Sequence, residues 1–167
     1  YHGQQTLGIS KQENNERILA TYQEATDAGA TLSPGRIYAR ADTLLALGKT
    51  EDALELSRRL PEGFVGRHLS LLRRAVDREL DSRRGNRELA LRLISEYLAA
   101  SGLKPEDRVW ALSRQARALL DQGLAQEAIS KILRELQRFD NIQAEELAPI
   151  YALLGEAYLE SGAIDPA

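Results

Sequence analysis

Apolar residues recur every three or four positions through most of this chain, which is the spacing of helices that have one apolar face. Proline and glycine interrupt the pattern at short intervals, and they favour helix starts and helix ends respectively. The pattern predicts helices over 12–28, between 34 and 48, between 50 and 61, over 65–80, between 86 and 102, between 105 and 123, over 125–139, and from near 143 onward. Residues 1–10 show no periodicity, and we expect an irregular end there.

Local signals refine these helices. Ser33 before Pro34, Thr50 and Asn86 stand at helix starts, where a hydroxyl or amide side chain is expected to cap the first free N–H groups. The helix over 65–80 should bury the face that holds Val65, Leu69, Leu72, Val76 and Leu80.

Composition agrees with a fold made of helices alone. The 167 residues are 43% hydrophobic but only 5% aromatic, and alanine and leucine dominate the apolar share, which suits closely packed helices better than sheets. This length and this apolar content suffice for one domain with a continuous core. The sequence therefore predicts the all-α class.

Four turn glycines recur at a nearly fixed period. Gly48, Gly85, Gly123 and Gly162 are separated by 37, 38 and 39 residues. An alanine follows each glycine after five residues, at Ala53, Ala90, Ala128 and Ala167. A constant period of this size is typical of helical repeats, and a small residue at a fixed place lets the second helix of each pair approach the first.

The stretch from Tyr151 to Gly162 resembles the first helix of a tetratricopeptide (TPR) unit. Leu154, Gly155 and Tyr158 match the family's spacing, with Tyr151 standing where the family usually has tryptophan. The resemblance implies a right-handed α-solenoid of stacked antiparallel helix hairpins, a TPR-like superhelix. About three and a half hairpins would form a single repeat domain over 33–167, after a preceding helix within 1–32.

The earlier units depart from the family pattern. Arg40 and Gln115 stand where the family has leucine, and the period exceeds the usual value of about 34 residues. In the second unit, the family's packing positions counted back from Gly85 would be Arg74, Asp77, Arg78 and Asp81. Charged residues do not form a buried face, so we expect a longer turn between the two helices of this unit. Because the last hairpin is cut at Ala167, we expect a piece of a larger protein, with either further repeats or self-association through the exposed end.

The resemblance also implies a binding groove, because TPR proteins hold peptides on a concave surface lined by their first helices. Carrying over the family's positions gives Tyr38, Asp42, Leu45, Trp110, Ser113, Arg117, Leu120, Ala152, Glu156 and Leu159 as candidate peptide contacts. Tyr38 and Trp110 can equally pack between neighbouring hairpins. The carboxylate clamp of co-chaperone TPR domains needs Lys, Asn and Arg; its corresponding sites here, which include Ser113, Arg114 and Arg117, hold no asparagine, so that clamp is absent.

The sequence offers no constellation for catalysis, metals or cofactors. There is no cysteine, and His2 and His68 have no second ligand at metal-binding spacing. No serine lies in a nucleophile motif, and adjacent carboxylates fall in first helical turns, where the helix dipole stabilises them. We therefore expect no enzyme, no catalytic residue, no metal site and no cofactor. No apolar run is long enough to insert into a membrane.

Arginine is concentrated between residues 57 and 92, where ten arginines face five acidic residues although the whole chain carries −3. One interpretation is a site for anions or acidic peptides. It would be formed by Arg67, Arg73, Arg74, Arg78, Arg83, Arg84 and Arg87. The other, which we favour, is a solvated helix face with i,i+4 pairs such as Arg73 with Asp77 and Glu88 with Arg92. Nucleic-acid binding is not expected, because only Phe64 interleaves the basic stretch.

Two functions remain open from the sequence. The first is a non-enzymatic scaffold that binds a protein or peptide of unknown identity on the concave surface. The alternative is a regulatory or sensing domain of a larger enzyme or transcription factor. Localisation also stays open between the cytoplasm and a bacterial periplasm, because the absence of cysteine does not separate the two.

Overall fold

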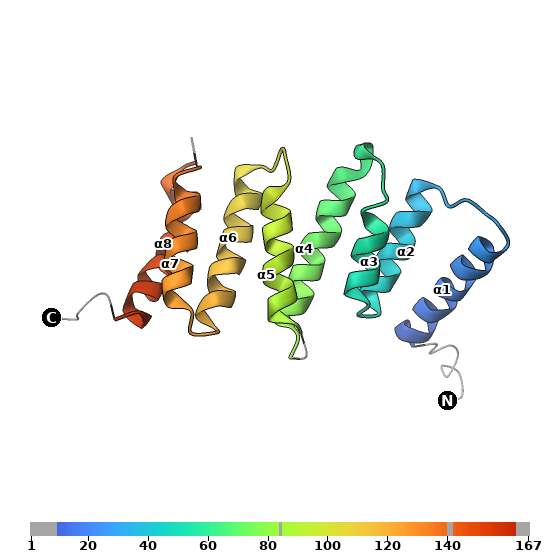
Figure 1. Ribbon diagram of the computed structural model, residues 1–167, viewed down its shortest axis with the longest axis horizontal. Helices are drawn as coiled ribbons and strands as arrows, with labels where there is room; N and C mark the ends of the chain where they lie inside the picture. Colours follow the sequence, from blue (N-terminus) through green and yellow to red (C-terminus); the bar gives the residue numbers. More distant parts are fainter. Residues whose placement is uncertain (1–9, 84, 140–141, 163–167) are drawn as a thin grey trace, which may run out of the picture. The chain divides into compact units, whose positions relative to one another are not determined.

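The computed structural model describes residues 10–83, 85–139 and 142–162. The predicted positions Arg84 and Ala167 and the irregular start over 1–9 lie outside these ranges. Within them the protein is all-α, as predicted, with eight α-helices and one short 3-10 helix (Figure 1). Their bounds are α1 (Lys11–Asp27), α2 (Pro34–Ala46), α3 (Thr50–Ser57), η1 (Glu62–Phe64), α4 (Val65–Asp81), α5 (Arg87–Ala99), α6 (Pro105–Leu120), α7 (Ala125–Leu136) and α8 (Ala144–Glu160).

The chain divides into two compact units, residues 1–75 and 76–167. The division falls within α4, and the single repeat domain over 33–167 stays a prediction.

In the first unit, α2 and α3 form a helical hairpin around two alanines. Ala41 and Ala53 are both fully buried, so the two helix backbones approach closely at this point. Gly48 ends the first helix with a φ of 81°, a left-handed conformation that favours glycine. Thr50, predicted as a cap, is instead the first residue of α3 and is buried, while Lys49 holds the cap position. Ser33 precedes Pro34 as predicted, but its side chain makes no capping hydrogen bond.

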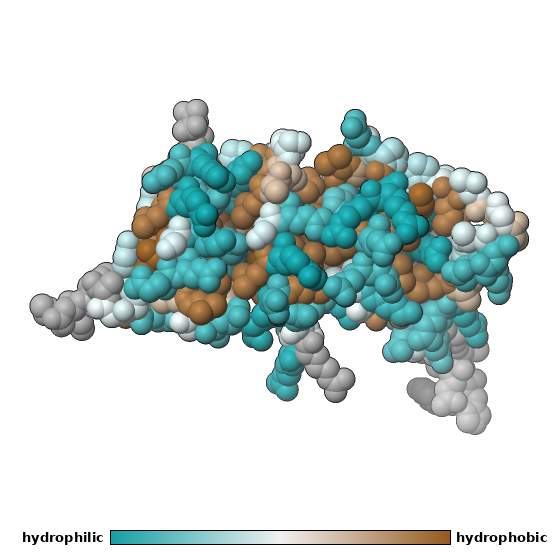
Figure 2. All heavy atoms as spheres, in the orientation of Figure 1, coloured by the Kyte–Doolittle hydropathy of each residue, from teal (hydrophilic) through white to brown (hydrophobic). Residues whose placement is uncertain are grey.

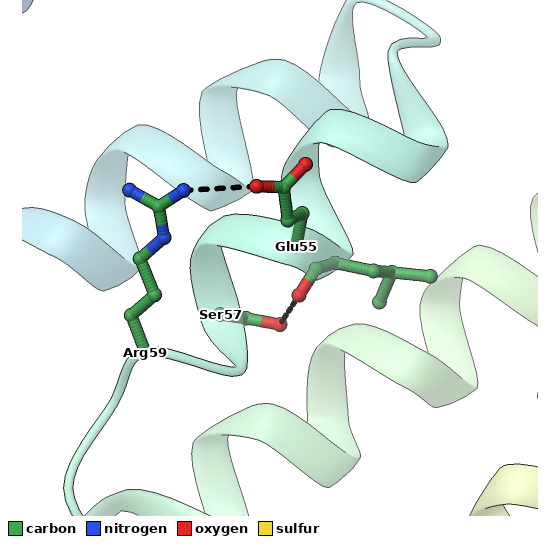
Figure 3. Close-up of polar contacts among 4 residues, drawn as sticks. Glu55, Ser57 and Arg59 are labelled. Carbon is green, nitrogen blue, oxygen red and sulfur yellow. Dashed lines mark hydrogen bonds and ion pairs between the residues drawn. The ribbon is translucent and has the colours of Figure 1, made fainter.

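The end of α3 is fixed by polar contacts of two kinds (Figure 3). The hydroxyl of Ser57 is buried, donates to the carbonyl of Leu54 at 2.9 Å and lies 2.8 Å from Nδ1 of His68 in α4. Arg59 and Glu55 form an exposed ion pair at 2.8 Å. His68 is thus engaged by a buried serine of α3, which gives this histidine a structural role.

α1 packs on α2 but contributes no buried residue. Its start carries a capping box in which Ser10 and Glu13 bond to each other's backbone N–H groups. Arg40 of α2 donates to the side-chain oxygen of Gln23 in α1 at 2.9 Å. Polar contacts and partly buried apolar residues therefore hold α1.

In the second unit, α6, α7 and α8 share one apolar core. It includes Leu112 and Leu119 of α6, Ile132 of α7 and Ile150 of α8, each at most 2% exposed. α6 also packs on α5. Gly123 links α6 to α7 with a φ of 72°, in the same way as Gly48 links α2 to α3.

The turn between α4 and α5 is closed by backbone contact. A Cβ atom on Gly85 would lie 2.0 Å from the carbonyl oxygen of Glu79, so only glycine fits. The largely buried carboxylate of Glu79 accepts a hydrogen bond from the backbone N–H of Asn86 at 2.8 Å. Asn86 caps α5 as predicted, because its side chain accepts from the N–H of Leu89 at 3.0 Å.

The predicted apolar face of α4 is only partly correct. Leu72 and Val76 are buried, but Val65 is 45% exposed. The helix also buries Leu71 and Ala75, so its core-facing stripe is rotated from the predicted one.

Candidate functional site

The clearest candidate site is a surface pocket of about 370 Å³ between α6 and α8 in the second unit. Its lining residues are Ser113, Arg114, Arg117, Pro149, Ala152, Leu153 and Glu156. Four of these, Ser113, Arg117, Ala152 and Glu156, were candidate groove residues in the sequence. The structure therefore brings together residues that lie about 39 positions apart in the chain.

Helix geometry explains why these residues line one pocket. Ser113 and Arg117 are four positions apart on α6, so they lie one turn apart on the same face. Pro149, Ala152 and Glu156 follow the same spacing on α8. Pro149 lies inside α8 and has no N–H group, so one main-chain carbonyl of the helix loses its usual donor beside the pocket.

Arg117 and Glu156 form an ion pair across the pocket. Their two nitrogen–oxygen distances are 2.5 and 2.8 Å, the geometry of a bidentate pair. The hydrogen bond and charge of Glu156 raise the pKa of the Arg117 guanidinium, although desolvation partly opposes this shift. The two side chains stay 49% and 38% exposed, so the pair is accessible and screened by solvent.

Arg114 joins the pocket to the C-terminal part of α4. Its guanidinium lies 2.9 Å from Asp77 and 3.4 Å from Asp81. The sequence reasoning placed Arg114 at a groove site but did not choose it as a contact. Arg114 could have been predicted from the sequence, because it lies next to Ser113 and on the same helix as Arg117, which were both candidates.

Three predicted groove residues of the second unit do not line the pocket between α6 and α8. Leu120 is 5% exposed and belongs to the core, which corrects its prediction as a groove contact. Trp110 is partly buried and packs edge-on against Tyr97, with ring centroids 5.3 Å apart. Leu159 is 62% exposed but does not line this pocket.

The candidates from the first unit also have internal contacts. Leu45 is 3% exposed, so it is a core residue and its prediction as a groove contact is wrong. Asp42 pairs with Arg74 of α4. Tyr38 lies under the guanidinium of Arg67, which is 5.3 Å from its ring centroid and also stacks on Phe64.

The arginine-rich stretch is divided between the two units. In the first unit Arg73 is half-buried, Arg74 pairs with Asp42 and Arg67 stacks on aromatic rings. In the second unit Arg78, Arg83 and Arg87 are exposed. The anion site remains a prediction, with Arg84 outside the described residues.

A second pocket, of about 480 Å³, lies between α1, α2 and α3. It was not predicted from the sequence. Its lining mixes Arg40, Lys49 and Arg59 with Asp52 and Glu55. Basic and acidic groups alternate there, so it favours no ligand charge.

The described parts of the chain hold neither a metal-binding cluster nor a membrane-spanning helix. No cluster of three or more His, Cys, Asp or Glu residues there could hold a metal ion. Within the same residues, no helix has the length and apolar character to cross a membrane. No protein-family model, no curated protein and no solved structure matches the chain.

Proposed function

We propose that this chain is a non-enzymatic protein-interaction domain that binds a peptide or protein segment in the pocket between α6 and α8. The observation that carries the proposal is that four groove candidates from two helices line this one pocket. A shallow site on rigid helices, with arginines beside small and apolar residues, suits an extended peptide better than a reaction centre.

The proposal includes a TPR-like solenoid of stacked helix hairpins as the scaffold. Supporting it, Ala53, Ala90 and Ala128 are all fully buried at the recurring position five residues after a turn glycine. Two of those glycines, Gly48 and Gly123, connect helices that pack on each other. These are the features that a repeated hairpin requires.

The chemistry of the pocket indicates the preferred peptide. The guanidinium groups of Arg114 and Arg117 already pair with acidic side chains, and they can bind a carboxylate of the ligand in addition. Ala152 and Leu153 offer apolar contact on the other side. We expect a segment in which an acidic residue, or a C-terminal carboxylate, lies next to an apolar side chain.

The test is a selection from a random peptide library displayed on phage. Peptides selected on the wild-type chain should carry this acidic and apolar pattern. Ala152→Arg should weaken their binding at least tenfold, because the new side chain fills the pocket. Ala148→Arg is the matched control, since Ala148 is also exposed on α8 but does not line the pocket. Equal binding to both variants would refute the proposed site.

A further inference from the structure

A third pocket, of about 200 Å³, lies between α5, α6 and α7 in the second unit. Hydrophilic and apolar side chains alternate over the visible surface of this unit (Figure 2), and the pocket has the same mixture. Its lining includes Leu91 and Ser95 of α5, Gln115 and Leu119 of α6, and Glu127 and Lys131 of α7. The three helices are inner ones, with α4 before them and α8 after them in the chain.

Gln115 is the unusual residue of this pocket. It is only 5% exposed, and within the described residues its amide makes no hydrogen bond. Buried amides are usually hydrogen-bonded, because leaving one unpaired is costly. The amide is not sealed inside the core, so it opens to the pocket that Gln115 lines. There it offers both a donor and an acceptor to a ligand.

The pocket is separate from the one between α6 and α8. Gln115 lies two positions from Ser113 and two from Arg117. Two positions along an α-helix turn a side chain by about 200° around the helix axis. Gln115 therefore lies on the opposite side of α6 from these two residues of the α6–α8 pocket.

The first unit shows another use of the position that Gln115 holds. Gly48 and Gly123 lie 75 residues apart. Moved back by that number, three residues of this pocket fall on residues that line the pocket between α1, α2 and α3, namely Arg40, Leu44 and Asp52. There Arg40 donates to Gln23 of α1 at 2.9 Å and so joins two helices. Gln115 makes no such bond to α5, so the same place in the period holds an amide that a ligand can reach.

Two charged residues of α7 border the pocket. Glu127 and Lys131 are one helical turn apart, so their side chains lie on the same side of α7. Neither side chain makes an ion pair or a hydrogen bond with another described residue. A ligand that carries an ammonium group next to a carboxylate can therefore pair with both residues.

We propose that this pocket binds a free amino acid with a carboxamide side chain, L-glutamine or L-asparagine. The carboxamide of the ligand accepts one hydrogen bond from the amide of Gln115 and donates another to it. Its ammonium group lies against Glu127 and its carboxylate against Lys131. The pocket is smaller than the roughly 300–1,000 Å³ of sites for drug-sized ligands, so a single amino acid fits it better than a longer peptide. This site does not depend on the function proposed for the α6–α8 pocket.

Isothermal titration calorimetry of the full chain tests the choice of ligand. L-Glutamine or L-asparagine should bind saturably, with a Kd of about 1 mM or below. L-Glutamate and L-aspartate have nearly the same shape, but their side-chain carboxylates cannot donate a hydrogen bond, so they should bind about tenfold more weakly or worse. Glutamine and asparagine with acetylated and amidated ends lose both charges and should bind as weakly as the acidic amino acids.

Variants of the full chain locate the binding. Gln115→Leu removes the amide and keeps an apolar side chain, as at Leu154, which lies 39 residues further on. It should weaken binding about tenfold or more without lowering the urea midpoint, so that lost binding is not lost folding. Gln126→Leu is the matched control and should bind like wild type, because Gln126 is exposed on α7 and does not line the pocket. Lys131→Gln, at the half-buried rim, should weaken binding about fivefold.

Four results would each overturn the proposal. The first is that neither L-glutamine nor L-asparagine binds up to about 10 mM. The second is that the acidic amino acids bind as tightly as the carboxamides, because the amide of Gln115 would then not select the ligand. The third is that Gln115→Leu binds like wild type. The fourth is that the capped amino acids bind as tightly as the free ones, because the ligand would then be a side chain of a peptide.

Discussion

The substitution Ala128→Arg should destabilise the core of the second unit strongly. Ala128 is fully buried in the cluster formed by α6, α7 and α8. Overpacking such a site costs roughly 1–3 kcal/mol, and a buried guanidinium without a partner costs roughly 3–5 kcal/mol more. The expected loss of about 4–8 kcal/mol is a large part of the 5–15 kcal/mol typical for a domain. With a urea dependence of about 2 kcal/mol per molar, the midpoint should fall by about 2 M or more.

The assay is urea unfolding followed by tryptophan fluorescence. Trp110 is the only tryptophan of the chain and packs against Tyr97, so it reports on the second unit alone. Ser130→Arg is the matched control, because Ser130 is exposed on the same helix and receives the same side chain. If Ala128→Arg leaves too little folded protein, Ala128→Leu should still lower stability by about 1–3 kcal/mol. Equal midpoints for Ala128→Arg and Ser130→Arg would refute the burial of this repeat position.

Three further changes have expected outcomes. Gly85→Ala should lower the unfolding free energy by at least about 2 kcal/mol, because its Cβ atom would meet a backbone carbonyl. Gly155→Ala should raise the unfolding free energy by about 1 kcal/mol, because alanine has the higher helix propensity. Thermal melts of the two variants and the wild type measure both effects. Asn86→Ala should cost about 0.5–2 kcal/mol in urea unfolding by removing the α5 cap. Arg117→Ala should cost only about 0.2–1 kcal/mol. Since the hydrogen bond and charge of Glu156 raise the pKa of Arg117 above its ordinary value, the arginine's contribution to stability is fully present at neutral and mildly basic pH and is lost only in strongly basic solution. Urea midpoints of wild type and Arg117→Ala should therefore differ by the same amount at pH 7 and pH 9.

The sequence predicted the features that depend on local chemistry. Helix ends at Gly48 and Gly123 followed from the conformational freedom of glycine, and both adopt the left-handed conformation. Three of the four alanines at the repeat positions, Ala53, Ala90 and Ala128, are fully buried, as expected of small residues at a helix contact. Asn86 was identified as a cap because an amide side chain directly before an apolar helical pattern is a typical helix start. The helix ends and the cap needed only residues within one or two helical turns, whereas the alanines followed from the period of 37 to 39 residues.

Predictions that depend on how helices are rotated against each other were less successful. The family pattern predicts Leu45 and Leu120 as groove contacts, but each lies four positions after a buried alanine and so shares its core-facing side. The pairing of Arg114 with Asp77 joins residues 37 positions apart. A single sequence holds too many other charges to single out that pair. Likewise, Pro149 and Leu153 could not be assigned to a pocket before the two helices were placed side by side.

The most direct test of peptide binding between α6 and α8 is a chemical-shift titration. The full chain, labelled with ¹⁵N, would be titrated with an unlabelled peptide from the phage selection. The account predicts that the largest amide shifts fall at Ser113 and Arg117 of α6 and at Ala152 and Glu156 of α8. Shifts confined to α1, or to the exposed arginines at 83 and 87, would contradict it.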